Sequence, residues 1–369
     1  MINLTVEELK PGMVVAESIV TKRGQTIAKS GTPLSSQLIA KLTFYKIESV
    51  SVEDPVVKEK PATPEPSTST NSTSQQITYT QRLKASPKFQ KFQSDYALNI
   101  SYLRENFDAI IAGGGSECSD MLLENCESLF KDKTTLELFD MLSNMHTVED
   151  PIYAHSLNVA LIARCMGKWL KFPKGDLNIL TLCGLLHDIG KTQIPEAILN
   201  KPGRYTDEER ELMQSHPLLG VKLLKNKGFD SRIIASALQH HERHDGSGYP
   251  RGLTDDEIED FASIIAIADV YDAMTCARAH RDPLCSFQVI HEFEKDGLQK
   301  YNTKYLLTFL ERIANTYNNS RVILSDARTG HVVYINKSNL SRPVIQLDDG
   351  VVLNLADSTA SDIYVKAIL

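Results

Sequence analysis

The sequence lacks the features of a membrane protein or of a secreted, disulfide-rich protein. No apolar run approaches the roughly 20 residues that a membrane-spanning helix needs. The first residues carry neither the basic nor the apolar region of a signal peptide, so we expect none. The six cysteines never form a Cys-x-x-Cys pair, and several lie in apolar helical contexts that favour a reduced, buried thiol. Together these absences predict a protein of the reducing cytoplasm.

The sequence also lacks an excess of positive charge. Its 40 Lys and Arg residues against 47 Asp and Glu residues give a formal net charge of −7. That balance argues against a general nucleic-acid or membrane-surface binder, but it leaves room for a local basic pocket. With 369 residues, 42% hydrophobic and 24% charged, the chain has the composition of a globular protein of about two or three domains.

Shifts in composition divide the chain into segments. Short β-rich runs at Val14–Ala16 and Val50–Val52 flank a helix-like pattern in residues 35–45, and a Pro-rich stretch then leads into a Ser/Thr/Asn/Gln run. Helical periodicity follows to about Asn318, after which short β-rich runs return. The expected segments are a small α+β domain (1–54), a flexible low-complexity linker (55–78), a helical connector (79–145), an all-helical domain (146–318) and a small β extension (319–369).

Metal-binding side chains follow three apolar runs. His187-Asp188 follows Leu182–Leu186, His240-His241 follows Ile233–Gln239, and Asp269 follows Ile264–Ala268. We expect three apolar helices that each end in such residues and converge on one buried polar site. With His155 and His216 the set offers five imidazoles and two carboxylates, which suits two divalent cations that share a carboxylate.

Several of these residues have a simpler interpretation when taken singly. His155, on an otherwise apolar helix, could be a histidine that is satisfied by the core. His216 precedes Pro217 and is therefore expected at a break between two helices. Asp269 could be a buried carboxylate that accepts hydrogen bonds from backbone groups. It is the joint pattern that favours the dinuclear metal site.

The motifs are similar to those of a known family. They are His187-Asp188-Ile189-Gly190-Lys191, then His216, then His240-His241-Glu242-Arg243-x-Asp245-Gly246-Ser247-Gly248-Tyr249-Pro250, then Asp269-Val270-Tyr271-Asp272-Ala273. This set resembles the HD-GYP family of bacterial metal-dependent phosphodiesterases, which act on cyclic di-GMP and have the all-helical HD-domain fold. The resemblance covers roughly residues 145–315. Residues 1–54 resemble the domain of unknown function often found before HD-GYP domains, and the tail resembles the short extension that often follows them.

The resemblance implies a role for particular residues. One metal would be bound by His155, His187, Asp188 and Asp269, and Asp188 would bridge to a second metal bound by His216, His240 and His241. Lys191 would face the scissile phosphate and is, with Asp188, a candidate catalytic residue. The candidate substrate-binding residues are Lys191, Tyr249 beside the guanine, and Arg278 and Arg281 on the phosphates.

The resemblance also implies a reaction. The expected activity is hydrolysis of cyclic di-GMP to pGpG and/or GMP by a metal-bridging hydroxide, with Fe or Mn as the two divalent ions, which would lower this second messenger in bacterial signalling. Two alternatives stay open: a weakly active or non-catalytic cyclic-di-GMP sensor, and an HD phosphohydrolase that acts on another nucleotide. A signalling protein is expected to bind residues 1–54, a homodimer is left open, and neither a nucleic-acid polymer nor a membrane is expected as a partner.

The chain departs from the family pattern in three places. Pro151 stands where some members carry a glutamate for a third metal, although Glu149 or Asp150 could replace it. The usual Asp-Arg-Pro-Tyr run reads Ala277-Arg278-Ala279-His280, and an arginine often found before Asp269 is Ser263. The first departure favours two metals over three, and the other two put substrate affinity in doubt.

Overall fold

The structure is a computed structural model that describes residues 2–10, 12–20, 26–34, 38–39, 42, 47, 49–52, 83–145, 151–201, 203–276 and 283–369. It divides into two compact units, Met1–Leu98 and Asn99–Leu369, each of which is treated by itself. The predicted linker 55–78, Glu149 and Asp150, and the predicted substrate residues Arg278 and Arg281 lie outside the described residues.

The N-terminal unit contains two small antiparallel sheets. Strand β1 (Ile2–Thr5) pairs with β4 (Ser49–Val52), and β2 (Ile19–Val20) pairs with β3 (Thr26–Ala28). Val15 forms an isolated bridge to Val52, and both are buried in a core with Leu9, Leu42 and Val50. The predicted strand at 50–52 therefore lies within β4, whereas most of the predicted helix at 35–45 lies outside the described residues.

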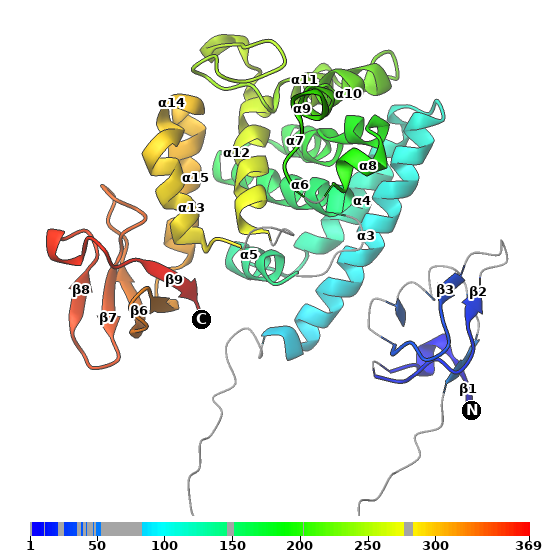
Figure 1. Cartoon of the computed structure of the whole chain (residues 1–369), viewed down its shortest axis with the longest axis horizontal. Helices are drawn as coiled ribbons and strands as arrows, with labels where there is room; N and C mark the ends of the chain where they lie inside the picture. The colour runs from blue at the N-terminus through cyan, green and yellow to red at the C-terminus, as the bar shows by residue number, and fades with distance from the viewer. Residues whose placement is uncertain are drawn as a thin grey trace, which may run out of the picture. The chain divides into compact units, whose positions relative to one another are not determined.

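The second unit is mainly helical (Figure 1), and α3 (Pro87–Ile111) contains the boundary between the two units. Its other α-helices are α4 (Ser119–Phe130), α5 (Thr135–Ser143), α6 (Pro151–Trp169), α7 (Lys174–Leu186), α8 (Glu196–Leu199), α9 (Asp207–Gln214), α10 (His216–Leu224), α11 (Ser231–Gln239), α12 (Asp260–Thr275), α13 (Ser286–Glu292), α14 (Leu298–Lys300) and α15 (Thr303–Thr316). Among the described helices, none is long and apolar enough to span a membrane.

Helices α6, α7 and α12 form the centre of this unit and pack against one another (Figure 1). Both α6 and α12 bury residues on nearly every side, as expected for helices that lie inside a bundle. Gly184 allows α7 to lie very close to α6, because a Cβ at this position would be only 2.4 Å from Ala160 Cα on α6. This close contact brings the C-terminal end of α7 next to α6.

Helix boundaries agree with the local signals in part. The capping box Thr206–Glu209 begins α9, and Pro217 lies in the first turn of α10. The break expected at His216 lies one residue earlier, at Ser215, and His216 is the first residue of α10. A second capping box, Thr254–Glu257, begins only the 3-10 turn η4 (Asp255–Glu257). Helix α12 starts after it, and its N-cap Glu259 accepts hydrogen bonds from the first-turn amides.

The C-terminal residues form a five-stranded antiparallel sheet in the order β8-β7-β6-β5-β9. Its strands are β5 (Arg321–Leu324), β6 (Thr329–Tyr334), β7 (Val344–Leu347), β8 (Val352–Asn354) and β9 (Val365–Ile368). The sheet contacts α13 through β9, where Cys285 Sγ lies 3.1 Å from the carbonyl oxygen of Val365. The mainly α architecture with small β elements, expected from the sequence, is confirmed.

Candidate metal centre

His187 and Asp188 lie at the junction of α7 and the 3-10 turn η3 (Ile189–Gln193), where both are almost fully buried. His187 is the C-cap of α7, and Asp188 is the N-cap of η3. Gly190 allows η3 to lie against the start of α10, because a Cβ at this position would lie only 1.9 Å from the carbonyl oxygen of His216. The short turn therefore brings Asp188 next to His216.

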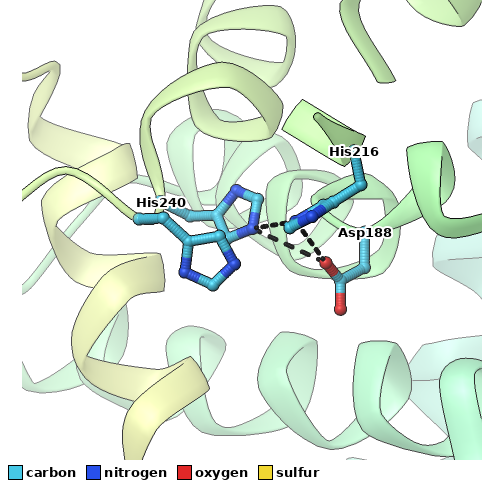
Figure 2. A group of neighbouring side chains, drawn as sticks. Asp188, His216 and His240 are labelled. Atoms are coloured by element: carbon cyan, nitrogen blue, oxygen red, sulfur yellow. Dashed lines mark hydrogen bonds and ion pairs between the residues drawn. The ribbon is translucent and has the colours of Figure 1, made fainter. Parts of the chain in front are cut away.

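The two carboxylate oxygens of Asp188 face two different sets of histidines. Its Oδ2 lies 3.3 Å from His187 Nε2 and 3.6 Å from His155 Nε2. Its Oδ1 lies 3.2 Å from His216 Nε2 and 3.5 Å from His240 Nε2 (Figure 2). Asp188 is thus shared by two groups of potential metal ligands, one with His155 and His187 and the other with His216, His240 and His241.

Asp269 lies beside both groups, but its position in the helix differs from the prediction. Its Oδ1 lies 3.0 Å from His155 Nε2, and its Oδ2 lies 3.8 Å from His241 Nδ1. The prediction that the apolar run before Asp269 ends a helix is wrong, because α12 continues to Thr275. The helix can continue because the residues that follow are also accommodated in the core: Tyr271 is buried, and Asp272 binds His155.

Three histidine rings are oriented by backbone carbonyl groups. A carbonyl oxygen only accepts hydrogen bonds, so the Nδ1 that faces it carries the proton and donates, and Nε2 keeps its lone pair. The pairs are His187 with Gly184 O at 2.8 Å, His216 with Met213 O at 2.7 Å and His240 with Ser236 O at 3.0 Å. All three Nε2 lone pairs therefore face the Asp188 carboxylate, as metal ligands require.

The donor set fits divalent cations. His187 Nε2 and Asp188 Oδ1 are buried and have no hydrogen-bond partner among the described residues. Buried polar atoms without a partner are costly, by roughly 1–3 kcal/mol each. A cation in each of the two groups would give each of these atoms a partner. Imidazole nitrogens and carboxylate oxygens are ordinary ligands of divalent transition metals. The cluster is therefore a divalent-metal site in its chemistry as well as in its geometry.

The protonation states agree with metal binding. Burial works to raise the pKa of Asp188, but its contacts with the surrounding imidazole rings and with the Lys191 ammonium outweigh burial and hold this pKa well below its usual range. Burial lowers the pKa of His240 to about 4 and also lowers that of His241, so both rings are neutral near pH 7. These are the states from which carboxylates and imidazoles coordinate metals without first losing a proton.

His155 is electrostatically different from the other histidines. Burial lowers its pKa, but hydrogen bonds and charge from Asp269 and Asp272 outweigh burial and raise the pKa to about 10. Without a cation, the ring is therefore protonated at neutral pH. A cation that binds at His155 Nε2 would replace the proton on that nitrogen, and the negative charge of Asp269 and Asp272 would stabilise the cation as it stabilises the proton.

The sequence reasoning assigned no role to Asp272, which contacts the predicted ligand His155. Asp272 Oδ2 accepts a hydrogen bond of 2.7 Å from His155 Nδ1, and its Oδ1 accepts one of 2.8 Å from Asn158. Cys276 Sγ lies 3.1 Å from the same Oδ1. The spacing of three residues between Asp269 and Asp272 on a helix was a signal that both face the same neighbour.

Two other predicted site residues, Lys191 and Tyr249, lie at the edge of the cluster. Lys191 of η3 places Nζ 2.5 Å from Asp188 Oδ2, and its side chain is 23% exposed. The ring of Tyr249 stacks on His241, with the centroids 4.6 Å apart and the planes inclined by 26°. Ser263, one of the three departures from the family pattern described above, lies 3.3 Å from His244 Nε2 through its Oγ. Pro151, in the position of the third-metal glutamate, begins α6 and is exposed.

Comparison with known proteins places this cluster in a family context. Residues 118–304 match the HD domain family. The chain is 35% identical over 167 residues to the cyclic di-GMP phosphodiesterase PA4108 of Pseudomonas aeruginosa. The aligned region covers 45% of this chain and 40% of that protein. It is 34% identical over 160 residues to the 3'3'-cGAMP-specific phosphodiesterase 2 of Vibrio cholerae. That aligned region covers 43% of this chain and 31% of that protein.

A solved structure shares the fold. Bd1817, an HDG"Y"P protein of Bdellovibrio bacteriovorus, superposes with a TM-score of 0.55 at 15% identity, over 85% of this chain and 99% of that one. The chain spans less than half the length of the two curated relatives described above. Because the family match covers about half of this sequence and includes all seven residues of the cluster, the chain belongs to the HD domain family.

Proposed function

We propose that the protein is a metal-dependent phosphodiesterase that hydrolyses cyclic di-GMP to pGpG and/or GMP. The observation that carries the proposal is the position of Asp188, whose two oxygens face two separate sets of histidines. A carboxylate shared in this way is the arrangement that a two-metal hydrolase needs. The name of the Pseudomonas relative supports cyclic di-GMP as the substrate.

Two divalent ions, with Fe or Mn as the candidates, would be held by the cluster. His155, His187, Asp188 and Asp269 would hold one ion, and Asp188, His216, His240 and His241 the other. When bound, the pair of ions supplies positive charge for the phosphate oxygens and lowers the pKa of water towards about 7. The ring orientations described above support this assignment, because Nε2 of His187, His216 and His240 faces Asp188.

Asp188 and Lys191 would act nearest the reacting phosphate. The Lys191 ammonium lies against Asp188 Oδ2, which is also the oxygen nearest His187 and His155. A cation at that oxygen would compete with the ammonium, and the partly exposed side chain could then turn to a phosphate oxygen of the substrate. Lys191 would there neutralise charge that develops in the transition state.

Tyr249, Arg278 and Arg281 would hold the rest of the substrate. Tyr249 lies on His241 and so is placed where a nucleotide base could contact it beside the metal centre. Arg278 and Arg281 follow α12 in the sequence, and α12 is the helix that carries Asp269. Both arginines lie in residues 277–282, which are outside the described residues. Their guanidinium groups are suited to bind phosphate oxygens in pairs.

The roles of the other segments are also proposals. We infer that the chain has an N-terminal domain (1–54), a linker (55–78), a helical connector (79–145), a phosphohydrolase domain (146–318) and a β extension (319–369). The family match begins at residue 118, within the proposed connector. We place the protein in the cytoplasm, where it would lower cyclic di-GMP and report to a signalling protein through residues 1–54. A homodimer is compatible with this role.

The test is hydrolysis by the metal-loaded chain. Protein purified anaerobically with Mn or Fe is incubated with cyclic di-GMP or with 3'3'-cGAMP, and the products are separated by chromatography. We expect pGpG or GMP, with cyclic di-GMP consumed faster. His187→Ala should abolish turnover, whereas the matched control His331→Ala, on an exposed strand position of β6, should not.

Two other results would replace the proposal. Faster turnover of 3'3'-cGAMP would favour the activity after which the Vibrio relative is named. Cyclic di-GMP binding without turnover by the loaded protein would favour a sensor.

A further inference from the structure

The loop that contains Tyr249 folds back onto the end of α11. An isolated bridge between Asp245 and Thr254 closes the base of the loop. Within it, Tyr249 N donates a hydrogen bond of 3.2 Å to His241 O. Gly248 lies so close to the chain that a Cβ there would be 2.5 Å from both Glu242 Cα and His241 O. The loop therefore rests directly on the backbone that carries the histidine pair.

Glu242 fastens the far side of this loop. Its side chain is buried, although the residue directly follows the two cluster histidines. Glu242 Oε1 accepts a hydrogen bond of 2.8 Å from Arg251 N, and Oε2 accepts one of 3.0 Å from Leu253 N. Each oxygen thus holds a backbone amide that comes after Tyr249-Pro250, and Glu242 belongs to neither group of potential metal ligands.

We propose that Glu242 is a positioning residue that preforms the lip of the site. It ties the loop to the same turn of chain that presents His240 and His241, so the Tyr249 ring is held on His241 before any ligand arrives. Hydrogen bonds from backbone amides to a carboxylate are stronger than those to a neutral acceptor, and burial strengthens them further. The proposal rests on the proposed function in one respect, which is that Tyr249 contacts the substrate.

Glu242→Gln tests this role with almost no change in size. The amide keeps one accepting oxygen and presents an NH2 group to the other backbone N–H, so one of the two bonds is lost. The matched control is Glu259→Gln, because Glu259 also accepts two backbone amides, at 2.8 and 3.0 Å, but these belong to the first turn of α12. Both variants are prepared as the full-length, metal-loaded chain.

Hydrogen exchange of the loop is the first measurement, and it needs no substrate. In Glu242→Gln the amides of Arg251 and Leu253 should exchange faster than in the wild type, whereas Glu259→Gln should leave them unchanged. Metal content should equal that of the wild type. For cyclic di-GMP, KM should rise roughly tenfold, the ratio expected for one lost charged hydrogen bond. The kcat should stay within about threefold, because the lip acts on binding.

Gly248→Ala supplies a second, independent perturbation. Its Cβ would push the same loop away from His241 and Glu242 while the Glu242 carboxylate stays intact. It should reproduce the rise in KM, and the double variant with Glu242→Gln should be no worse than the more severe single variant.

Three results would overturn the proposal. They are wild-type exchange at Arg251 and Leu253 in Glu242→Gln, a fall in kcat with KM unchanged, and loss of metal from the variant. If the wild-type protein itself fails to hydrolyse cyclic di-GMP, the proposed function fails. The exchange rates still decide whether Glu242 holds the loop.

Discussion

Asp188→Asn removes one carboxylate oxygen from a residue that belongs to both groups of potential metal ligands. The asparagine keeps a single oxygen, so at best one of the two histidine sets retains its shared ligand. The amide NH2 then faces the other set, either His216 and His240 or His155 and His187, and cannot coordinate a cation. Loss of a group that only orients a ligand typically lowers metal affinity by roughly 10- to 100-fold. Loss of a direct ligand should therefore lower it by more than about 100-fold at one position.

The assay is metal content per chain after desalting, measured together with kcat. We expect the wild type to retain two ions and the variant to retain one or none, with kcat at least ~100-fold lower. The control is Asp256→Asn, which makes the same chemical change at an exposed position of η4. Retention of two ions and of wild-type kcat by Asp188→Asn would refute the shared-ligand reasoning.

Three further predictions follow from other parts of the structure. Asp272→Asn should weaken metal binding at the His155 position by roughly 10- to 100-fold, measured by calorimetric titration, because His155 Nδ1 loses its charged acceptor; an unchanged affinity would contradict this. Gly184→Ala should destabilise the fold by about 1–3 kcal/mol in urea unfolding, since its Cβ would overlap Ala160, whereas Gly175→Ala, with open space around it, should not. Chelation of the metals should lower the free energy of unfolding by about 2.7 kcal/mol if the free metal had been at 100 times Kd, and should lower Tm accordingly. An unchanged Tm would argue against metal binding to the folded chain.

Features set by local chemistry were predictable from the sequence. The apolar runs before His187 and His240 are helices that end where the polar pairs begin, because each run buries its side chains and the pair lies at a helix terminus. Pro217 marked the break before α10, and the capping box at Thr206 marked the start of α9. These signals depend on residues a few positions apart, which is the range over which periodicity and capping act.

Features set by distant contacts were not predictable in the same way. His155 and Asp272 are far apart in the chain, so their hydrogen bond depends on how α6 packs on α12. The apolar run before Asp269 carries no stop signal, and the helix simply continues through it. Glu242 follows the histidine pair as a third polar residue, but its partners are backbone amides that local sequence does not identify.

The central claim is that Asp188 bridges two cations, and anomalous diffraction tests it most directly. Crystals of the Mn-loaded chain are measured on both sides of the manganese absorption edge. We expect two anomalous peaks about 3.5–4 Å apart, one beside each oxygen of Asp188. One peak should lie near His155 and His187, and the other near His216, His240 and His241. A single peak, or two peaks that do not share Asp188, would contradict it.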